Sequence, residues 1–210
     1  MKQETFPVPV RKTLKIAVCV GFVLTVLLSF TGFAALTSEC EQISDQVLRL
    51  HILANSDSEA DQALKLAVRD RILEEGQTLF RDAHKKEDAI AQATECLPQL
   101  RQAALDEIKA RGFDYDVQVS LGKVFFNTRH YEAITLPAGH YDALQIRIGK
   151  AQGKNWWCVL FPSLCVPSAS NVTLDDVLNP EQMELVENAG HHEVKFKVVE
   201  WYEGIRSWFS

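Results

Sequence analysis

An uncharged run near the amino terminus constrains this chain more than any other feature. Residues 16–36 read IAVCVGFVLTVLLSFTGFAAL, 21 positions without a charge. As a helix rising about 1.5 Å per residue, the run is long enough to cross a hydrocarbon core of roughly 30 Å. A helix buried in a soluble core seldom lacks a polar face over such a length. The run therefore predicts a transmembrane anchor or a signal sequence.

The charges around this run predict the side of the membrane on which the rest of the chain lies. Basic side chains precede the run, whereas Glu39, Glu41 and Asp45 follow it. The positive-inside rule then leaves the amino terminus in the cytoplasm. We expect a basic cytoplasmic segment over 1–15, a signal peptide or membrane anchor over 16–36, a short polar stalk over 37–46 and an exported domain over 47–210.

Two fates of the leader remain open. Its apolar run is longer than the 7–15 residues usual in a cleaved signal peptide, which favours retention as an anchor. Small residues at 32–36 nevertheless offer a site for signal peptidase. Glu39, directly before Cys40, occupies a position where a lipoprotein signal needs a small residue, so we do not expect lipidation.

Composition and charge indicate a globular exported domain. Hydrophobic residues make up 47% and charged residues 24% of the 210 residues, as in ordinary globular proteins. The net charge of −6 divides into +3 for residues 1–36 and −9 for the remainder. Proteins bind nucleic acid largely because their basic side chains release counterions from the phosphate backbone. A domain this acidic lacks that contribution to binding, so we expect no nucleic-acid partner.

Periodicity predicts an α+β fold for the exported part. Residues 47–54, rich in branched aliphatics, predict a buried strand. Ser58 can cap a helix whose apolar stripe recurs at helical spacing; its members are Leu64, Ala67, Val68 and Ile72. A second helical stretch over 87–110 contains Pro98, which predicts a kink or two consecutive helices, and it ends before Gly112.

The second half of the exported part alternates as strands do. Apolar residues recur at every second position over 117–121 and 144–148, and further runs cover 131–136 and 156–161. We expect an antiparallel meander of three or four strands. Residues 193–209 fit both a strand and a helix, and a helix is favoured because its stripe spans the whole segment.

The thiols and imidazoles give little support to catalysis or metal binding. Cys158 and Cys165 flank a predicted turn at Pro162, and an oxidising exterior permits a disulfide between them, with two buried thiols as the alternative. A nucleophilic Cys158 with His51 as its base would need both groups within hydrogen-bond reach, and we expect His51 to be a core histidine. The Cys and His residues lack zinc-finger spacing, so we predict no metal site. We also predict no catalytic residues and no cofactor.

Two long segments go beyond general architecture. LRLHILANSDSEADQALKLAVRDRIL, over 48–73, and KNWWCVLFPSLC, over 154–165, resemble two signatures of the stage II sporulation protein R family. The LPAG turn at 136–139 and the aromatic, basic C-terminal segment are similar as well. The resemblance covers nearly the whole chain, leader included.

The resemblance implies a messenger without chemistry of its own. Proteins of this family are made in the forespore and exported into the space between forespore and mother cell. There they trigger a membrane-embedded aspartic protease in the opposing membrane, which processes a sigma-factor precursor. Two other functions remain open, a wall- or peptide-directed hydrolase and a structural, membrane-tethered protein of the intermembrane space.

Two groups of residues are candidates for contact with that protease. The first is a polar constellation, for which a helix cap followed by a solvated face is the favoured alternative; its members are Asn55, Ser56, Asp57, Asp61, Gln62, Lys65 and Arg69. The second is Asn155, Trp156 and Trp157. Neighbouring residues of a strand face opposite ways, so one tryptophan should face outward, and exposed Trp is a frequent hot-spot residue.

Overall fold

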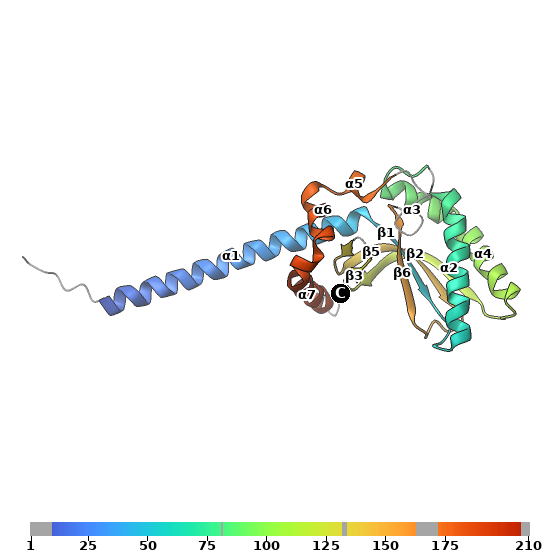
Figure 1. Cartoon of the computed structure of the whole chain (residues 1–210), viewed down its shortest axis with the longest axis horizontal. Coiled ribbons are helices and arrows are strands. Elements are labelled where there is room, and N and C mark those ends of the chain that lie inside the picture. Colours follow the sequence, from blue (N-terminus) through green and yellow to red (C-terminus); the bar gives the residue numbers. More distant parts are fainter. Residues whose placement is uncertain (1–9, 81, 132–133, 163–171, 207–210) are drawn as a thin grey trace, which may run out of the picture. The chain divides into compact units, whose positions relative to one another are not determined.

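The computed structural model describes residues 10–80, 82–131, 134–162 and 172–206. The chain divides into two compact units, Met1–Glu39 and Cys40–Ser210. The first unit is formed by most of helix α1 (Val10–Gln46), whereas the second contains every strand and the remaining helices (Figure 1). The sheet and its covering helices therefore belong to one domain.

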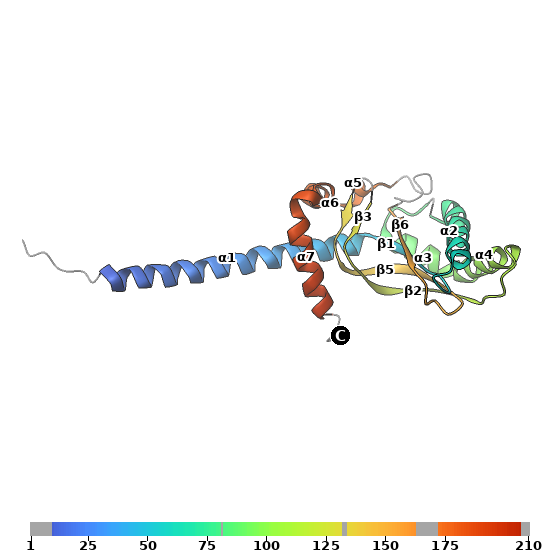
Figure 2. The ribbon, with the colours of Figure 1, turned by 60° about the horizontal axis from the view of Figure 1, so that its bottom comes forward.

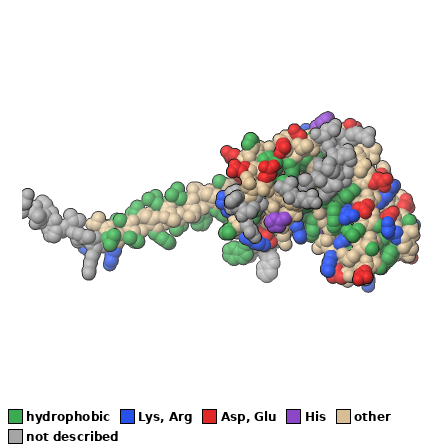
Figure 3. Space-filling model, in the orientation of Figure 1, with side chains coloured by type: hydrophobic (Ala, Val, Ile, Leu, Met, Phe, Trp, Pro, Cys, Tyr) green, Lys and Arg blue, Asp and Glu red, His purple; other side chains and the backbone are tan. Residues whose placement is uncertain are grey.

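Helix α1 carries the uncharged run. Its large apolar side chains are exposed from Leu14 to Phe30, and Figure 3 shows hydrophobic side chains along its length. Among the described residues, α1 is long and apolar enough to cross a membrane. A retained anchor and an export signal both fit such a helix, and both are compatible with export.

The segment expected as a stalk, residues 37–46, is helical and completes α1. Its residues 40–46 belong to the second unit, where Cys40, Ile43 and Ser44 are buried. Apolar residues at 40, 43 and 47 explain this burial, because positions three and four apart share one face of a helix.

The second unit is built on a four-stranded mixed sheet in the order β2-β5-β1-β6. Strand β1 lies parallel to β5 and antiparallel to β6, while β2 and β5 are antiparallel. The strands are β1 (Leu48–Leu53), β2 (Val117–Phe126), β5 (Gly139–Ile148) and β6 (Asn155–Phe161). A short hairpin of β3 (Arg129–His130) and β4 (Thr135–Leu136) follows the end of β2.

The predicted α+β class is confirmed, but the expected meander needs correction. Strands β5 and β6 follow one another in the chain, yet β1 lies between them. Positions 48–52 are buried on both faces of the sheet, as in a central strand. Burial of both the apolar and the polar side chains of β1 therefore matches its place in the interior of the sheet, between β5 and β6.

Helices cover one face of the sheet (Figure 2). They are α2 (Glu59–Leu79), α3 (Lys86–Glu95) and α4 (Leu97–Ala110). The predicted cap and stripe of α2 are confirmed: the Ser58 hydroxyl accepts from the Asp61 N–H at 3.2 Å, and Leu64, Val68 and Ile72 are buried. Pro98 lies in the first turn of α4, so the predicted stretch is two consecutive helices.

The predicted stop after the second helical stretch is confirmed at Gly112. This residue has a φ of +83°, a conformation that glycine adopts at little cost. Its N–H donates to the Lys109 carbonyl at 2.9 Å, and the N–H of Phe113 donates to the Ile108 carbonyl at 3.1 Å. These bonds satisfy carbonyl groups at the end of α4.

The C-terminal part is helical, as the longer of its two patterns predicts. The helices are α5 (Leu174–Val177), α6 (Pro180–Glu187) and α7 (Ala189–Arg206). In α7, Phe196, Val199 and Glu203 are buried. The strand-like alternation at 194–198 is thus overridden by helical packing.

Candidate functional site

The predicted polar constellation forms a hydrogen-bonded network at the corner between β1 and α2, which we call the corner network (Asn55, Ser56, Asp57, Asp61, Gln62 and Lys65). The Asp61 carboxylate accepts from Asn55 Nδ2 at 2.9 Å and from Ser56 Oγ at 2.5 Å. Gln62 Nε2 donates to the Ser56 carbonyl at 2.8 Å, and Lys65 Nζ donates to Gln62 Oε1 at 2.7 Å. Five members from the loop and α2 are thereby joined directly.

The corner network also holds the turn between β5 and β6. The Lys154 N–H donates to Asp57 Oδ1 at 2.6 Å, and Lys65 Nζ donates to the Lys154 carbonyl at 3.1 Å. At Gly153 an added Cβ would collide with the Ser56 carbonyl. The close approach of these two backbones therefore requires glycine.

Burial and hydrogen bonding compete at Asp61. Burial raises the pKa of this carboxyl, but hydrogen bonds from Ser56, Asn55, Tyr115 and Ser58 outweigh that effect, and the pKa lies below its ordinary value. Asp61 therefore remains ionised at neutral pH, because the donors around it replace lost water.

The face of α2 expected to be solvated is largely internal. Asp61 and Lys65 are only 4% and 5% exposed, whereas Arg69 is half-buried. Burial chiefly lowers the pKa of Lys65, and the nearby Asp57 partly opposes this. Sequence reasoning missed this burial because the corner network depends on a turn almost 90 residues away. Contact between these residues and a partner stays a prediction.

Trp156 and Trp157 face opposite sides of the sheet. Trp156 packs against the helix-covered core, and the Arg69 guanidinium lies 5.1 Å from its ring centroid. Trp157 pairs with His51 across β1 and β6, on the other face. Both side chains are half-buried. Because Trp156 lies on the helix-covered side of the sheet, Trp157 is the outward tryptophan.

Rings and a guanidinium group surround Trp157, and we call these residues the Trp157 cluster (His51, Phe126, Arg129 and Trp157). The His51 and Trp157 rings stack with centroids 3.7 Å apart and planes 12° apart. Phe126 meets Trp157 edge to face at 4.7 Å, and the Arg129 guanidinium lies 5.0 Å from the Trp157 ring. The cluster thus brings together side chains from β1, β2, β3 and β6, of which Trp157 and Arg129 are half-buried.

Hydrogen bonds fix the His51 ring. Its Nε2 lies 3.0 Å from Asn155 Oδ1 and its Nδ1 lies 3.3 Å from Gln145 Nε2. Burial lowers the pKa of His51, although the bond to Asn155 opposes that effect. A neutral imidazole that donates from Nε2 and accepts at Nδ1 satisfies both partners.

Arg49 lies under this cluster and is 0% exposed. Its guanidinium lies 3.9 Å from the Phe126 ring and donates to the Tyr131 hydroxyl at 2.5 Å. Its Nε and Nη1 have no hydrogen-bond partner within the described part of the chain. Burial lowers the pKa of Arg49, and the Tyr131 contact opposes this.

Sequence reasoning missed Arg49, Phe126 and Arg129. A signal was present for Arg49, because a charged residue inside a continuous buried strand needs an unusual environment. The aromatic rings supply part of that environment through cation–π contact. Phe126 and Arg129 could not be found in this way, because they lie in a strand end and a short hairpin.

The structure argues against a Cys158–His51 dyad. Cys158 pairs with Leu50 and lies in the helix-covered core, whereas His51 faces the other side of the sheet. Cys158 takes part in a disulfide, and its predicted partner, Cys165, lies outside the described residues. That pairing therefore stays a prediction. Within the described ranges, no group of three His, Cys, Asp or Glu side chains is placed to hold a metal ion.

Comparison with known proteins identifies the family. Residues 44–171 match the family described as Stage II sporulation protein R. The protein named Stage II sporulation protein R of Bacillus subtilis (strain 168) is 35% identical over 187 residues, which cover 79% of this chain and 84% of that protein. No solved structure matches the chain. The chain thus belongs to the stage II sporulation protein R family.

Proposed function

We propose that the second unit is an exported sporulation signal that activates a membrane-embedded aspartic protease in the opposing membrane by direct contact. The activated protease would process a sigma-factor precursor. Family membership supports the role in sporulation. An apolar leader supports export, because a messenger between two compartments must place its folded part outside the cytoplasm.

The Trp157 cluster is the observation that carries the proposed contact. Trp157 is held between the His51 ring and the Arg129 guanidinium, so it loses little conformational freedom on binding. Tryptophan and arginine that are rigid before binding are typical centres of protein interfaces. We therefore assign the receptor contact to this face of the sheet.

The edge of the same face supplies polar groups for specificity. Arg147 and Asn155 are exposed beside the cluster. Asn155 already bonds to His51, and its remaining amide donors can serve a partner. A half-buried aromatic centre with a polar rim matches the usual anatomy of a protein interface.

The experiment adds purified residues 37–210 to the outside of cells that contain the protease and the precursor. Immunoblotting then measures the ratio of processed to unprocessed precursor. We expect processing to depend on the added domain and to saturate with its concentration. Processing that is unchanged by the domain would contradict activation and favour a structural tether. Turnover of peptides or wall fragments by the domain alone would favour a hydrolase.

A further inference from the structure

The exposed large hydrophobic side chains of the second unit gather on one helix. Among its described residues, all of them except Leu66 lie on α7. They are Val194 (78% exposed), Val198 (45%), Trp201 (73%), Tyr202 (42%) and Ile205 (43%). We call them the α7 stripe. Four of them recur at spacings of four, three and four residues, so they share one helix face.

A different face of α7 packs into the core of the second unit. The opposite face of α7 already buries Phe196 and Val199, which are each 1% exposed. A helix with one apolar face in the core and a second apolar face outside is poorly suited to water. We therefore expect the stripe to contact an apolar environment outside the second unit.

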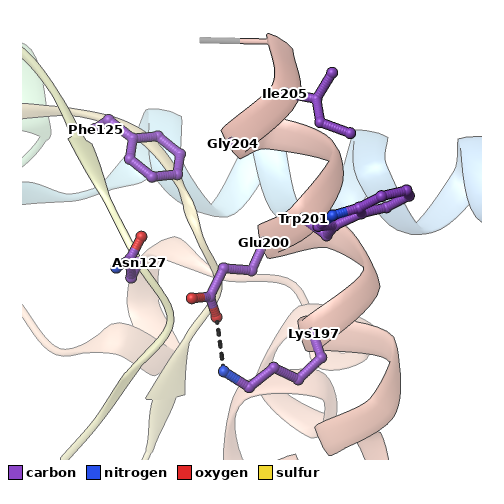
Figure 4. A pocket seen from close by; sticks show the side chains of 7 residues that line it. All are labelled: Phe125, Asn127, Lys197, Glu200, Trp201, Gly204 and Ile205. Carbon is purple, nitrogen blue, oxygen red and sulfur yellow. Dashed lines mark hydrogen bonds and ion pairs between the residues drawn. The ribbon is translucent and has the colours of Figure 1, made fainter. Parts of the chain in front are cut away.

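A hollow of about 480 Å³ lies beside the stripe, between α7 and the end of β2. Figure 4 shows Phe125 opposite the bare backbone of Gly204, with Trp201 and Ile205 projecting from the other side of the helix. A Cβ added at Gly204 would meet no atom within 4 Å. This edge of α7 therefore has room for apolar groups from outside the protein, such as acyl chains.

An ion pair joins the end of α7 to Glu41, a residue that follows the leader closely in the sequence. Arg206 Nη1 lies 2.6 Å from Glu41 Oε1, and both residues belong to the second unit. Glu41 follows the uncharged run by five residues. Even a fully extended chain of that length spans at most about 18 Å. Glu41, the residue that Arg206 contacts, is therefore tethered within that length of the uncharged run.

We propose that α7 lies in the headgroup region of the bilayer that α1 enters, with the α7 stripe turned toward the acyl chains. The proposal concerns the anchored chain, in which α1 is retained. Trp and Tyr are enriched at this depth because their rings are apolar and their N–H or O–H groups remain wet. Valine and isoleucine side chains on the same face add apolar area to the contact.

Basic side chains on α7 suit the same position. Lys195 is exposed, and the Lys197 side chain is 72% exposed beside Trp201. Glu200, the acidic neighbour on this helix, forms an ion pair with Lys197 at 3.4 Å. The charge of Lys197 is thus balanced within α7, and the exposed Lys195 can reach anionic lipid headgroups.

Fluorescence quenching by brominated lipids tests the proposal on the full chain. The chain is reconstituted into vesicles of phosphatidylglycerol and phosphatidylethanolamine whose acyl chains carry bromine near the headgroup or no bromine. The emission of Trp201 is taken as the difference between the natural chain and Trp201→Phe. Because Trp201 is mostly exposed, the substitution leaves the packing of α7 intact. Trp156→Phe gives the matched control for a tryptophan beside the core.

We expect brominated lipid to lower the Trp201 difference emission by at least about twofold and to leave the Trp156 difference emission unchanged. Equal Trp201 emission in both lipids would overturn the proposal. Quenching by aqueous iodide would then place the stripe in water, and protection from both quenchers would place it against protein. The readout contains no protease, so it stands apart from the proposed signalling.

Discussion

His51 and Trp157 lie opposite one another on neighbouring strands, and their rings stack at 3.7 Å. This pair couples a buried central strand to the sheet face that we propose as the receptor contact. The hydrogen bonds of His51 to Asn155 and Gln145 fix the orientation of the imidazole, and the imidazole in turn orients the indole. The proposed contact surface is therefore ordered by contacts within the fold itself.

Replacing Trp157 by alanine should impair signalling more than replacing Trp156. Loss of a hot-spot tryptophan costs about 2 kcal/mol or more of binding, which corresponds to at least about a 30-fold loss of affinity. We expect Trp157→Ala to lower precursor processing at limiting domain concentration, while Trp156→Ala lowers stability without a specific loss of binding. Circular dichroism and the secreted amount check folding and export. Normal processing by both variants would exclude the contact.

The stability of the domain should fall in mildly acidic solution because of His51. Its pKa is lowered in the folded state from an ordinary value of 6.5. The unfolded chain therefore binds the proton more readily, and the free energy of unfolding decreases as the pH falls below 6.5 toward the lower folded pKa. Urea unfolding of residues 37–210 at several pH values measures this effect. A His51→Gln variant should show a smaller decrease, and an equal decrease would show that other groups cause it.

Lys86 and Lys123 give a matched test of burial, because both contact Asp142. Lys86 Nζ lies 2.7 Å from the Asp142 carboxylate with its side chain 7% exposed, whereas Lys123 lies at 3.5 Å and is 54% exposed. Lys86→Met should lower the free energy of unfolding by about 1–3 kcal/mol, because the partly buried Asp142 carboxylate loses its closer donor and keeps only the longer contact to Lys123. Lys123→Met should change it by about 0–1 kcal/mol. Similar losses for the two variants would contradict the assigned burial.

Removing the charge of Asp61 should loosen the corner between β1 and α2. Its carboxylate accepts hydrogen bonds from Asn55 and Ser56, and an Asp61→Ala variant leaves both donors without this acceptor. We expect a loss of about 1–3 kcal/mol in the free energy of unfolding. Asp70→Ala, at an exposed position of the same helix, is the control and should change stability by less than about 0.5 kcal/mol. Equal effects at the two positions would show that the corner network does not stabilise the fold.

Local features of the fold could be predicted from the sequence because nearby residues determine them. Ser58 caps α2 by accepting a hydrogen bond from the N–H of Asp61, three residues later in the chain. Gly112 ends α4 because its backbone adopts a positive φ. The C-terminal helix was predicted because its apolar stripe repeats over several turns. The order of the strands could not be predicted in this way, because the place of β1 between β5 and β6 depends on pairings about 100 residues apart.

The candidate site was predictable only in part for the same reason. The opposite orientation of Trp156 and Trp157 follows from strand geometry and is confirmed. The partners of Trp157 come from three separate segments, so neither Arg129 nor Phe126 carries a local signal. Lys65 looks like a surface residue in the helical pattern, and only the distant Lys154 carbonyl explains its burial.

Cleavage of the precursor by the purified protease in vesicles is the most direct measurement of the central claim. The natural domain and the Trp157→Ala variant are each added to the outer surface, and the initial rate of cleavage is measured over a range of concentrations. The account predicts a rate that rises and saturates with the natural domain and that needs at least about 30-fold more of the variant for the same effect. A rate that does not respond to the natural domain would contradict it.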